Sequence, residues 1–275
     1  MPASAEIAVT ASDHRSPVRR VIAIANQKGG VGKTTTTVNL GSALAERGQR
    51  VLCVDLDPQG HLTVNMGVQR PDDLELTVYD LLLDARVAVG DVRLQAEGVG
   101  VDFLPANVEL AGAELQLVTE IGREAILREK LQPYMDEYDF VLIDCPPSLG
   151  LLCINALVAA TDVIIPLQCE YFGMKGMQQL HRTIDRVRAK LNPTLRIAGI
   201  LPTIHKTRTL HAREVLGMVR AHYGDAVFSI QVADSIRFAE CPLAGQSILQ
   251  YASDSDGARA YRELAGKVLE RVGVG

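Results

Sequence analysis

The chain has 275 residues, 47% of them hydrophobic and 22% charged, and its formal net charge is −5. This length and composition suit a globular protein with a large buried core. Its first 18 residues lack an apolar core segment, and its longest apolar stretch, residues 154–167, contains Asn155, Asp162 and Pro166. These features argue against a secretory signal and a membrane-spanning helix, so we expect a cytoplasmic protein.

Residues 1–18 show no hydrophobic period, and we expect a flexible tail there, followed by one domain over residues 19–275. The domain opens with a continuous apolar run at 21–25 that has the length of a buried strand. A glycine-rich turn follows, then a helical pattern at 34–47 and a second apolar run at 51–54. This order predicts a βαβ unit with a parallel pair of strands.

Further apolar runs follow along the chain, and helical patterns separate most of them. The runs predict strands at 101–104, 140–143, 163–167, 197–201 and 227–230. The patterns predict helices at 109–135, 151–159, 173–191, 211–222 and 258–272. Continuous apolar strands between helices are typical of a parallel sheet that is covered on both faces. The predicted fold class is therefore α/β, a mostly parallel twisted sheet with helices on both faces.

The turn after the first strand carries the sequence Lys28-Gly-Gly-Val-Gly-Lys-Thr-Thr35. Its glycines let backbone N–H groups approach phosphate oxygens, and the helix that follows adds partial positive charge. Lys33 supplies a full charge to the phosphates, and the Thr34 hydroxyl is a ligand for Mg²⁺. Gln27 stands where the usual pattern has glycine, and Lys28 is an extra lysine. Because two lysines in one loop repel each other, we expect Lys28 to act on nucleotide phosphate too.

Acidic side chains follow two of the predicted strands. Asp55 and Asp57 come after the run at 51–54, and Asp144 follows the run at 140–143. In an open parallel sheet, ligands bind beyond the carboxyl ends of the strands. An aspartate at that edge can hold Mg²⁺ or orient the attacking water. A turn or helix cap would explain either strand end alone, but two of them beside a phosphate loop indicate a nucleotide site.

These motifs together resemble the ParA/MinD group of deviant Walker A ATPases, and in particular the ParA/Soj ATPases that partition chromosomes and plasmids. The resemblance spans about residues 19–270. It rests on five segments: Asn26-Gln-Lys-Gly-Gly-Val-Gly-Lys-Thr-Thr35, Val54-Asp-Leu-Asp-Pro-Gln-Gly60, Ile143-Asp-Cys-Pro-Pro-Ser148, Gln168-Cys-Glu-Tyr171 and Arg237-Phe-Ala-Glu-Cys-Pro242.

The resemblance implies a weak, partner-stimulated ATPase that takes ATP and Mg²⁺ and forms a nucleotide-sandwich homodimer. It assigns catalytic roles to Lys28, which would reach the partner's phosphates, to Lys33, and to Asp57, which would position the hydrolytic water. The metal set would be Thr34, Asp57 and the Walker B carboxylate Asp144.

The same resemblance assigns nucleotide contacts to the whole loop and to one later segment. The loop residues are Lys28, Gly29, Gly30, Val31, Gly32, Lys33, Thr34 and Thr35. Gly29 would also lie against the partner subunit, where a larger side chain should block dimerisation. Near the adenine, this chain has Val232-Ala-Asp-Ser235 in place of the usual Ile-Pro-Arg-Asn-like stretch, so Ala233 and Ser235 are the candidates to line the base.

Basic residues are concentrated in one part of the chain. Ten lysines and arginines lie between Tyr171 and Arg220 against two acidic residues, which leaves −13 for the rest of the chain. Such asymmetry suits a phosphate-binding face, while a solvated helix face explains Arg182 and Arg186 equally well. By resemblance, Arg208 and Arg237 match positions that bind DNA without sequence preference, and Lys206 lies on the same loop as Arg208.

The resemblance thus predicts a nucleoid-associated partition ATPase that works with double-stranded DNA and a ParB-like centromere-binding protein. One alternative is a MinD-like membrane-associated ATPase, although the mixed charges of residues 258–272 favour a core-packing helix over a membrane anchor. A second is a ParA-like ATPase that positions protein cargo. A third is an iron–sulfur ATPase, for which Cys145 and Cys153 are the candidate ligands.

Overall fold

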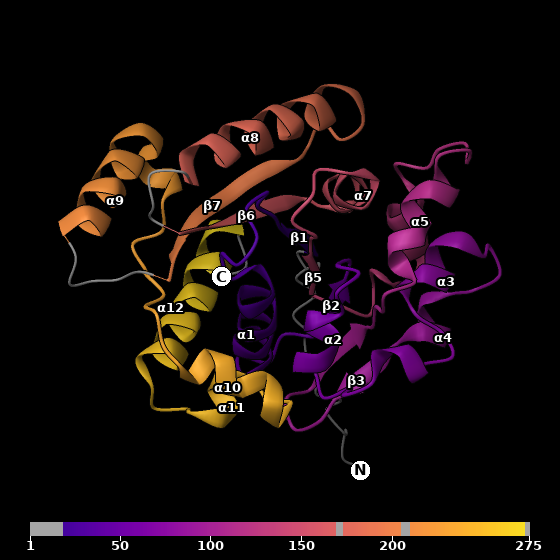
Figure 1. Ribbon diagram of the computed structural model, residues 1–275, viewed down its shortest axis with the longest axis horizontal. Helices are drawn as coiled ribbons and strands as arrows, with labels where there is room; N and C mark the ends of the chain where they lie inside the picture. The colour runs from indigo at the N-terminus through magenta and orange to yellow at the C-terminus, as the bar shows by residue number, and fades with distance from the viewer. Residues whose placement is uncertain (1–18, 169–172, 205–209, 273–275) are drawn as a thin grey trace, which may run out of the picture.

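The computed structural model describes residues 19–168, 173–204 and 210–272. Within these ranges, seven strands form one sheet in the order β3-β4-β2-β5-β1-β6-β7 (Figure 1). The strands are β1 (Arg20–Ile24), β2 (Val51–Asp55), β3 (Leu94–Ala96), β4 (Val101–Leu104), β5 (Phe140–Asp144), β6 (Asp162–Gln168) and β7 (Arg196–Thr203). All neighbours pair in parallel except β3 and β4. The predicted mostly parallel α/β fold is confirmed.

Helices cover both faces of the sheet, because successive side chains of each strand point to opposite sides. One face packs against α3 (Val78–Leu83), α4 (Val89–Val92), α5 (Leu110–Leu117), α6 (Ile126–Leu131), α7 (Leu151–Ala159), α8 (Gly173–Lys190) and α9 (Leu210–Tyr223). The other packs against α1 (Lys33–Ala45), α2 (His61–Asn65), α10 (Arg237–Ala244), α11 (Ile248–Tyr251) and α12 (Asp256–Val272). In β1, Ala23 faces the first group and Ile24 the second. Short 3₁₀ turns lie at 71–73, 132–134 and 224–226.

The predicted strand at 227–230 is wrong. Val227 makes only an isolated parallel bridge to Ile200. The backbone N–H of Phe228 donates to Ile200 O, and that of Val232 to Pro202 O, so the segment follows β7 without completing a ladder. Phe228 and Ile230 are nevertheless buried in the core. The apolar run therefore reflects burial of side chains rather than sheet pairing.

The predicted single helix at 109–135 is also wrong, because the structure contains two short helices, α5 and α6, separated by turns at 118–125. Gly122 lies in that connection with φ +73°, a conformation that favours glycine and ends helical winding. Asn155 of α7 secures the new start, since its side chain accepts a hydrogen bond from Leu127 N and donates one to Arg123 O. Apolar periodicity alone did not reveal this break.

The last helix, α12, lies against α1 (Figure 1). Its apolar stripe, which includes Tyr261, Leu264 and Val268, is buried in the core, as the sequence interpretation of a core-packing helix predicted. Among the described residues, no helix combines the length and the hydropathy that crossing a bilayer requires. The expected tail, residues 1–18, lies outside the described part of the chain.

One testable consequence concerns Gly199 in β7. A Cβ at this position would meet the Phe228 ring and would lie 2.7 Å from Nη1 of Arg271, whose guanidinium stacks on the same ring at 4.1 Å. We expect Gly199→Ala to lower the free energy of unfolding by about 1–3 kcal/mol, because a packed core must shift to admit the methyl group. Urea unfolding of the purified variant and the wild type measures this difference in the free energy of unfolding.

Gly217 offers a matched control, since it lies within α9 and a Cβ there meets nothing within 4 Å. Gly217→Ala should leave stability unchanged or raise it by about 0.5–1 kcal/mol, as alanine is the better helix former. Equal stability of Gly199→Ala and the wild type would contradict the packing described for β7.

Candidate functional site

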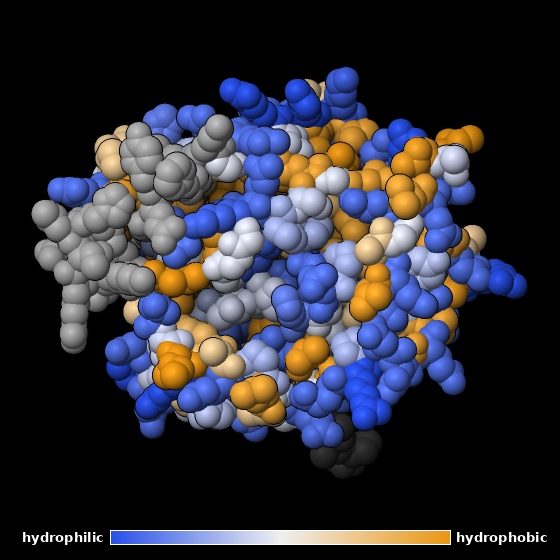
Figure 2. Space-filling model, in the orientation of Figure 1, coloured by the Kyte–Doolittle hydropathy of each residue, from blue (hydrophilic) through white to orange (hydrophobic). Residues whose placement is uncertain are grey.

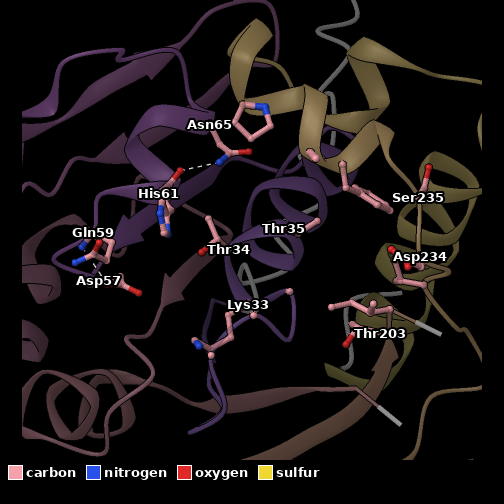
Figure 3. A pocket seen from close by; sticks show the side chains of 18 of the residues that line it. Lys33, Thr34, Thr35, Asp57, Gln59, His61, Asn65, Thr203, Asp234 and Ser235 are labelled. Atoms are coloured by element: carbon pink, nitrogen blue, oxygen red, sulfur yellow. Dashed lines mark hydrogen bonds between the residues drawn. The ribbon is translucent and has the colours of Figure 1, made fainter. Parts of the chain in front are cut away.

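A cavity of about 600 Å³ opens beside the carboxyl ends of β1, β2 and β7 (Figure 3). Four segments supply most of its lining: 29–35, 57–65, 203–204 and 232–242. This volume falls in the range of small-molecule sites, and its place at the carboxyl edge is where open α/β sheets bind ligands. The structure thus brings the glycine-rich loop and the residues after β2 to one cavity, as the sequence indicated.

The glycine-rich loop is fixed at both ends by hydrogen bonds to neighbouring strands. Asn26 donates from its side chain to Pro166 O at 2.7 Å and accepts from Lys28 N at 3.0 Å. On the other side, the Thr203 hydroxyl donates to Val31 O at 2.7 Å. Gly32 caps α1 with φ +83°, a backbone conformation that glycine allows. The loop is therefore preorganised to present backbone N–H groups at the start of α1.

The two loop lysines take different positions. Lys33 is buried and lines the cavity, where its Nζ lies 3.5 Å from Lys28 O. The side chain of Lys28 is not part of that lining, and its Nζ donates to Gln168 Oε1 at 2.8 Å, at the end of β6. Among the other predicted loop contacts, Val31 is buried beneath the surface, whereas Gly29, Gly30, Gly32, Thr34 and Thr35 line the cavity.

Asp55, which the sequence placed among the strand-end aspartates at this edge of the sheet, organises the segment that carries Asp57. Its buried carboxylate accepts three hydrogen bonds, from Asp57 N at 3.1 Å and from Thr63 N and Oγ1 at 2.9 and 2.8 Å. Thr63 Oγ1 in turn accepts from Ala106 N at 2.9 Å, just beyond β4. Asp55 therefore holds Asp57 at the cavity wall and ties α2 to β2, while Thr63 ties α2 to the segment after β4.

Asp144 ends β5 directly opposite Asp55 in the β2–β5 pairing. Its side chain is fully buried, and burial together with the charge of Asp55 raises its pKa well above the ordinary range. Burial also raises the pKa of Asp55 to about 7, although its hydrogen bonds from Thr63 oppose that shift. Two adjacent carboxylates in a dry sheet edge repel each other when both are ionised. A cation at this point would relieve that repulsion.

The residues present fit a magnesium ion. The Oδ2 atom of Asp144 is buried without a hydrogen-bond partner, and Thr34 and Asp57 both line the cavity above it. Carboxylate and hydroxyl oxygens are the ligands that Mg²⁺ prefers, and the ion usually keeps several waters and binds substrate phosphates. We therefore assign Thr34, Asp57 and Asp144 as candidates to hold it directly or through water.

The far wall of the cavity comes from the segment before and within α10. Ala233, Ser235 and Phe238 line it, and Tyr261 of α12 closes the floor, with its hydroxyl 3.3 Å from Thr36 Oγ1. Sequence reasoning missed the last two residues, because they are far along the chain from the phosphate loop. It also missed His61 and Asn65 on the opposite wall (Figure 3). Aromatic and apolar groups beside a phosphate site suit a purine base and ribose.

The candidate DNA-binding residues are placed only in part. Arg237 begins α10 and is exposed beside Ser235, to whose hydroxyl its backbone N–H donates at 3.4 Å. Lys206 and Arg208 lie outside the described residues. Among the basic residues of 171–220 whose side chains the structure describes, Arg188 pairs with Asp185 and Arg196 with Asp162. Arg182 and Arg186 are exposed on α8 and line a polar groove together with Leu149.

The two cysteines proposed for an iron–sulfur cluster lie in the interior. Cys145 and Cys153 are buried, and a hydrogen bond between their thiols, together with burial, raises the pKa of Cys145 well above its ordinary value. Cluster ligands must be thiolates, and a cluster shared by two subunits must lie at the surface. The described residues contain no group of three or more His, Cys, Asp or Glu side chains that could hold a metal ion. These observations count against the iron–sulfur alternative.

Known proteins resemble this chain over nearly its whole length. A family model described as an AAA domain matches residues 19–197. The chromosome partitioning protein ParA of Caulobacter vibrioides is 44% identical, over 92% of this chain and 94% of that protein. The sporulation initiation inhibitor protein Soj of Bacillus subtilis is 44% identical, over 90% of this chain and 98% of that protein.

Among solved structures, one described as cobyrinic acid a,c-diamide synthase from Mycobacterium smegmatis, with a bound ATP analog and magnesium, has a TM-score of 0.80. It is 43% identical to this chain and covers 92% of it and 95% of its own length. These relatives are thus similar to the chain in sequence over nearly its whole length, and the solved structure is similar to it in fold as well.

The buried carboxylates give a prediction about stability without nucleotide or metal. Because folding raises the pKa of Asp144, the folded protein keeps a proton that the unfolded chain releases above about pH 4. Stability contributed by this group is therefore present at low pH and is lost as pH rises. We expect Asp144→Asn to raise the free energy of unfolding at pH 7 by about 1–3 kcal/mol, with a smaller gain at pH 5. Urea unfolding in the presence of a chelator measures both values.

Asp162→Asn is a control for which the free energy of unfolding should change in the opposite direction. Asp162 is equally buried but pairs with Arg196 at 3.2 Å and with Arg20 at 3.7 Å. Asp162→Asn leaves these arginines without their partner, so the free energy of unfolding at pH 7 should fall. If Asp144→Asn lowers stability as Asp162→Asn does, the repulsion described between Asp144 and Asp55 is not present in the metal-free protein.

Proposed function

This chain belongs to the ParA/Soj family of P-loop ATPases, and we propose that it is a partition ATPase that dimerises on ATP and binds DNA without sequence preference. In this proposal a ParB-like centromere-binding protein stimulates hydrolysis, and the DNA-bound dimer associates with the nucleoid. Its Caulobacter relative is named a chromosome partitioning protein, and this name supports DNA as the cargo that is partitioned.

The protein is an ATPase that uses ATP and Mg²⁺. We assign the phosphates to the N–H groups at the start of α1 and to Lys33, which lines the cavity and is buried. When bound, Mg²⁺ would neutralise phosphate charge. Thr34 and Asp144 would hold the ion, and in this proposal Asp57, whose backbone N–H donates to Asp55, accepts a hydrogen bond from the attacking water.

The position of Lys28 carries the dimer proposal. It stands five residues before Lys33 in a phosphate-binding loop, yet its ammonium group lies outside the cavity and donates to Gln168. A cation that lies outside the cavity of its own phosphate loop can exchange its bond to Gln168 for the phosphates of a second copy, whose loop would face this one. Shared triphosphate would then hold the two subunits together by charge-assisted hydrogen bonds.

DNA binding is supported by exposed arginines on separate elements. Arg237 lies at the start of α10, next to the cavity wall formed by Ser235, while Arg182 and Arg186 project from α8. Figure 1 shows α8 and α10 at opposite sides of the molecule, so both cannot contact one short stretch of duplex in a single subunit. We propose that Arg237, together with Lys206 and Arg208, makes the non-specific DNA contacts.

Two alternatives within the family have less support. A MinD-like membrane anchor would need a free amphipathic helix, but the apolar stripe of α12 is buried against the core. A cargo-positioning relative would use the same nucleotide and DNA chemistry and would differ only in its partner. The amide-forming activity named for the Mycobacterium smegmatis structure belongs to that protein, and the partition relatives match this chain as fully.

Gly29 allows a clean test of the dimer. It is exposed at the cavity mouth, and a Cβ there would meet only Pro147, at 4.0 Å. We therefore expect Gly29→Val to fold and to bind ATP within about threefold of wild type, yet to sediment as a monomer with a slowly hydrolysed ATP analogue, because the bulk clashes only with a second subunit. Analytical ultracentrifugation measures the oligomeric state of the variant with the analogue, and its nucleotide affinity is measured in parallel.

Lys28→Ala is the companion variant, and it should also weaken the dimer because it removes the shared cation. If Gly29→Val dimerises with the analogue as the wild type does, the second copy does not dock across this loop. If the wild type itself stays monomeric with the analogue at high protein concentration, the dimer proposal is wrong.

The DNA proposal predicts a nucleotide-dependent salt response. If dimerisation doubles the phosphates contacted, log K for duplex DNA should fall about twice as steeply with log salt with the ATP analogue as with ADP. Fluorescence anisotropy with two unrelated duplexes measures the slopes and the lack of sequence preference. Arg237→Glu should weaken binding to both duplexes at least tenfold with the analogue and leave ATP affinity unchanged, whereas Arg70→Glu, an exposed control, should not. Equal slopes in all nucleotide states would contradict the proposed switch.

A further inference from the structure

Helix α5 is apolar on two sides, which a helix with only one packed face does not need. Its inner side, Leu110, Ala113 and Leu117, is completely buried against the sheet and α3. A second apolar stripe at helical spacing runs along its outer side and into the turns at both of its ends, and it consists of Val108, Ala111, Leu115 and Val118, all of them exposed. A helix that is apolar all round normally has a partner on each side.

The outer stripe is the main concentration of exposed apolar side chains in the described part of the chain. Four of the nine large apolar residues that are exposed there lie within fourteen positions: Val108 at 62%, Leu115 at 79%, Val118 at 55% and Ile121 fully exposed. Figure 2 shows apolar side chains gathered over the region where Figure 1 places α5 and α7. Apolar patches of this kind mark interaction sites in proteins that are otherwise well covered.

Acidic residues flank the stripe. Glu109 and Glu120 are exposed and Glu114 is half-buried, while residues 108–122 contain no lysine or arginine. The next cation, Arg123, is already engaged with Val118 O and Glu124. We propose that this surface, the α5 outer face, binds a basic amphipathic helix of a partner protein, with leucine-like side chains on the stripe and lysines or arginines beside the glutamates.

The acidic charge of the α5 outer face favours a basic helix over a second copy of this chain and over an anionic lipid surface. A second copy docked by the same face would bring its own glutamates against these, because a two-fold interface pairs each patch with itself. An anionic lipid surface would likewise be repelled by Glu109 and Glu120. A helix with basic flanks satisfies both the apolar stripe and the acidic rim. This proposal stands on α5 alone and does not depend on the dimer or on DNA binding.

The α5 outer face is also connected to the nucleotide site. Glu114 Oε1 accepts a hydrogen bond from Leu152 N at 3.1 Å, at the start of α7. That helix follows the loop 145–150, which leaves β5 directly after Asp144. Beyond α5, Asn155 of α7 bonds Arg123 O and Leu127 N. A partner on α5 would therefore rest on a helix that is fastened to the segment carrying the Walker B aspartate.

A synthetic peptide tests the proposal on the full chain. The probe is a fluorescein-labelled 18-residue helix with leucines on one stripe and lysines elsewhere. The first control peptide has the same composition with its leucines spread around the helix, and the second has glutamate in place of lysine. We expect the wild type to bind the probe at least tenfold more tightly than either control by fluorescence anisotropy, with affinity falling as salt rises.

Two sets of variants locate the binding. Leu115→Gln combined with Val118→Gln should weaken probe binding about tenfold or more, and Glu109→Gln with Glu120→Gln should flatten its salt dependence. Leu243→Gln is the matched control, since Leu243 is 84% exposed on α10, and it should bind the probe as the wild type does. Because all these side chains are exposed, the variants should unfold at the wild-type urea midpoint.

Three results would overturn the proposal. Probe binding by the Leu115→Gln, Val118→Gln variant that equals the wild type would place the peptide elsewhere. Equal affinity for the lysine and glutamate peptides would remove the role of the acidic rim. Nucleotide-free self-association of the wild type in sedimentation, lost in that double variant, would show that a second copy occupies the α5 outer face instead.

Discussion

Two carboxylates buried side by side determine how this site is built. Asp55 and Asp144 end neighbouring strands in register, both shielded from water. Ionised carboxylates in such surroundings are stable only when hydrogen bonds or cations compensate them. Asp55 receives three hydrogen bonds, whereas Asp144 retains one buried oxygen without a partner. The unequal compensation gives Asp55 a structural role and leaves Asp144 able to bind a metal ion. The buried Asp144 carboxylate therefore lowers the stability of the ligand-free protein and serves its function.

The remaining parts of the site are fixed relative to that pair by hydrogen bonds between distant segments. Asn26 fastens the phosphate loop to β6, and Thr203 fastens it to β7. Thr63 of α2 accepts from Ala106 N, after β4, and donates to Asp55, at the end of β2. None of these bonds lies within a helix or a strand ladder, and each spans at least eight residues in the chain. They make the carboxyl edge of the sheet a rigid frame that holds Lys33, Thr34 and Asp57 in place before nucleotide binds.

The sequence predicted what depends on local pattern. The phosphate loop and the strand-end aspartates were found because their spacing relative to apolar runs is a local property. The strand at 227–230 was wrong because burial of Phe228 and Ile230 imitates a strand, and the helix at 109–135 because Asn155, a distant residue, helps to define its break. The roles of Asp55, Thr203 and Tyr261 could not be predicted, because their partners are brought close only by the fold.

The loop 145–150 connects the features on the two sides of the site. A Cβ on Gly29, at the mouth that we assign to a second subunit, would meet Pro147 of this loop. At the other end of the loop, a Cβ on Gly150 would collide with the carboxylate of Glu114, which extends from α5. The loop begins directly after Asp144, so this short segment joins both of these contacts to the buried carboxylate pair. A nucleotide-bound dimer and a helix docked on α5 would therefore act on the same short segment, and each would alter the affinity of the protein for the other, since such coupling is reciprocal.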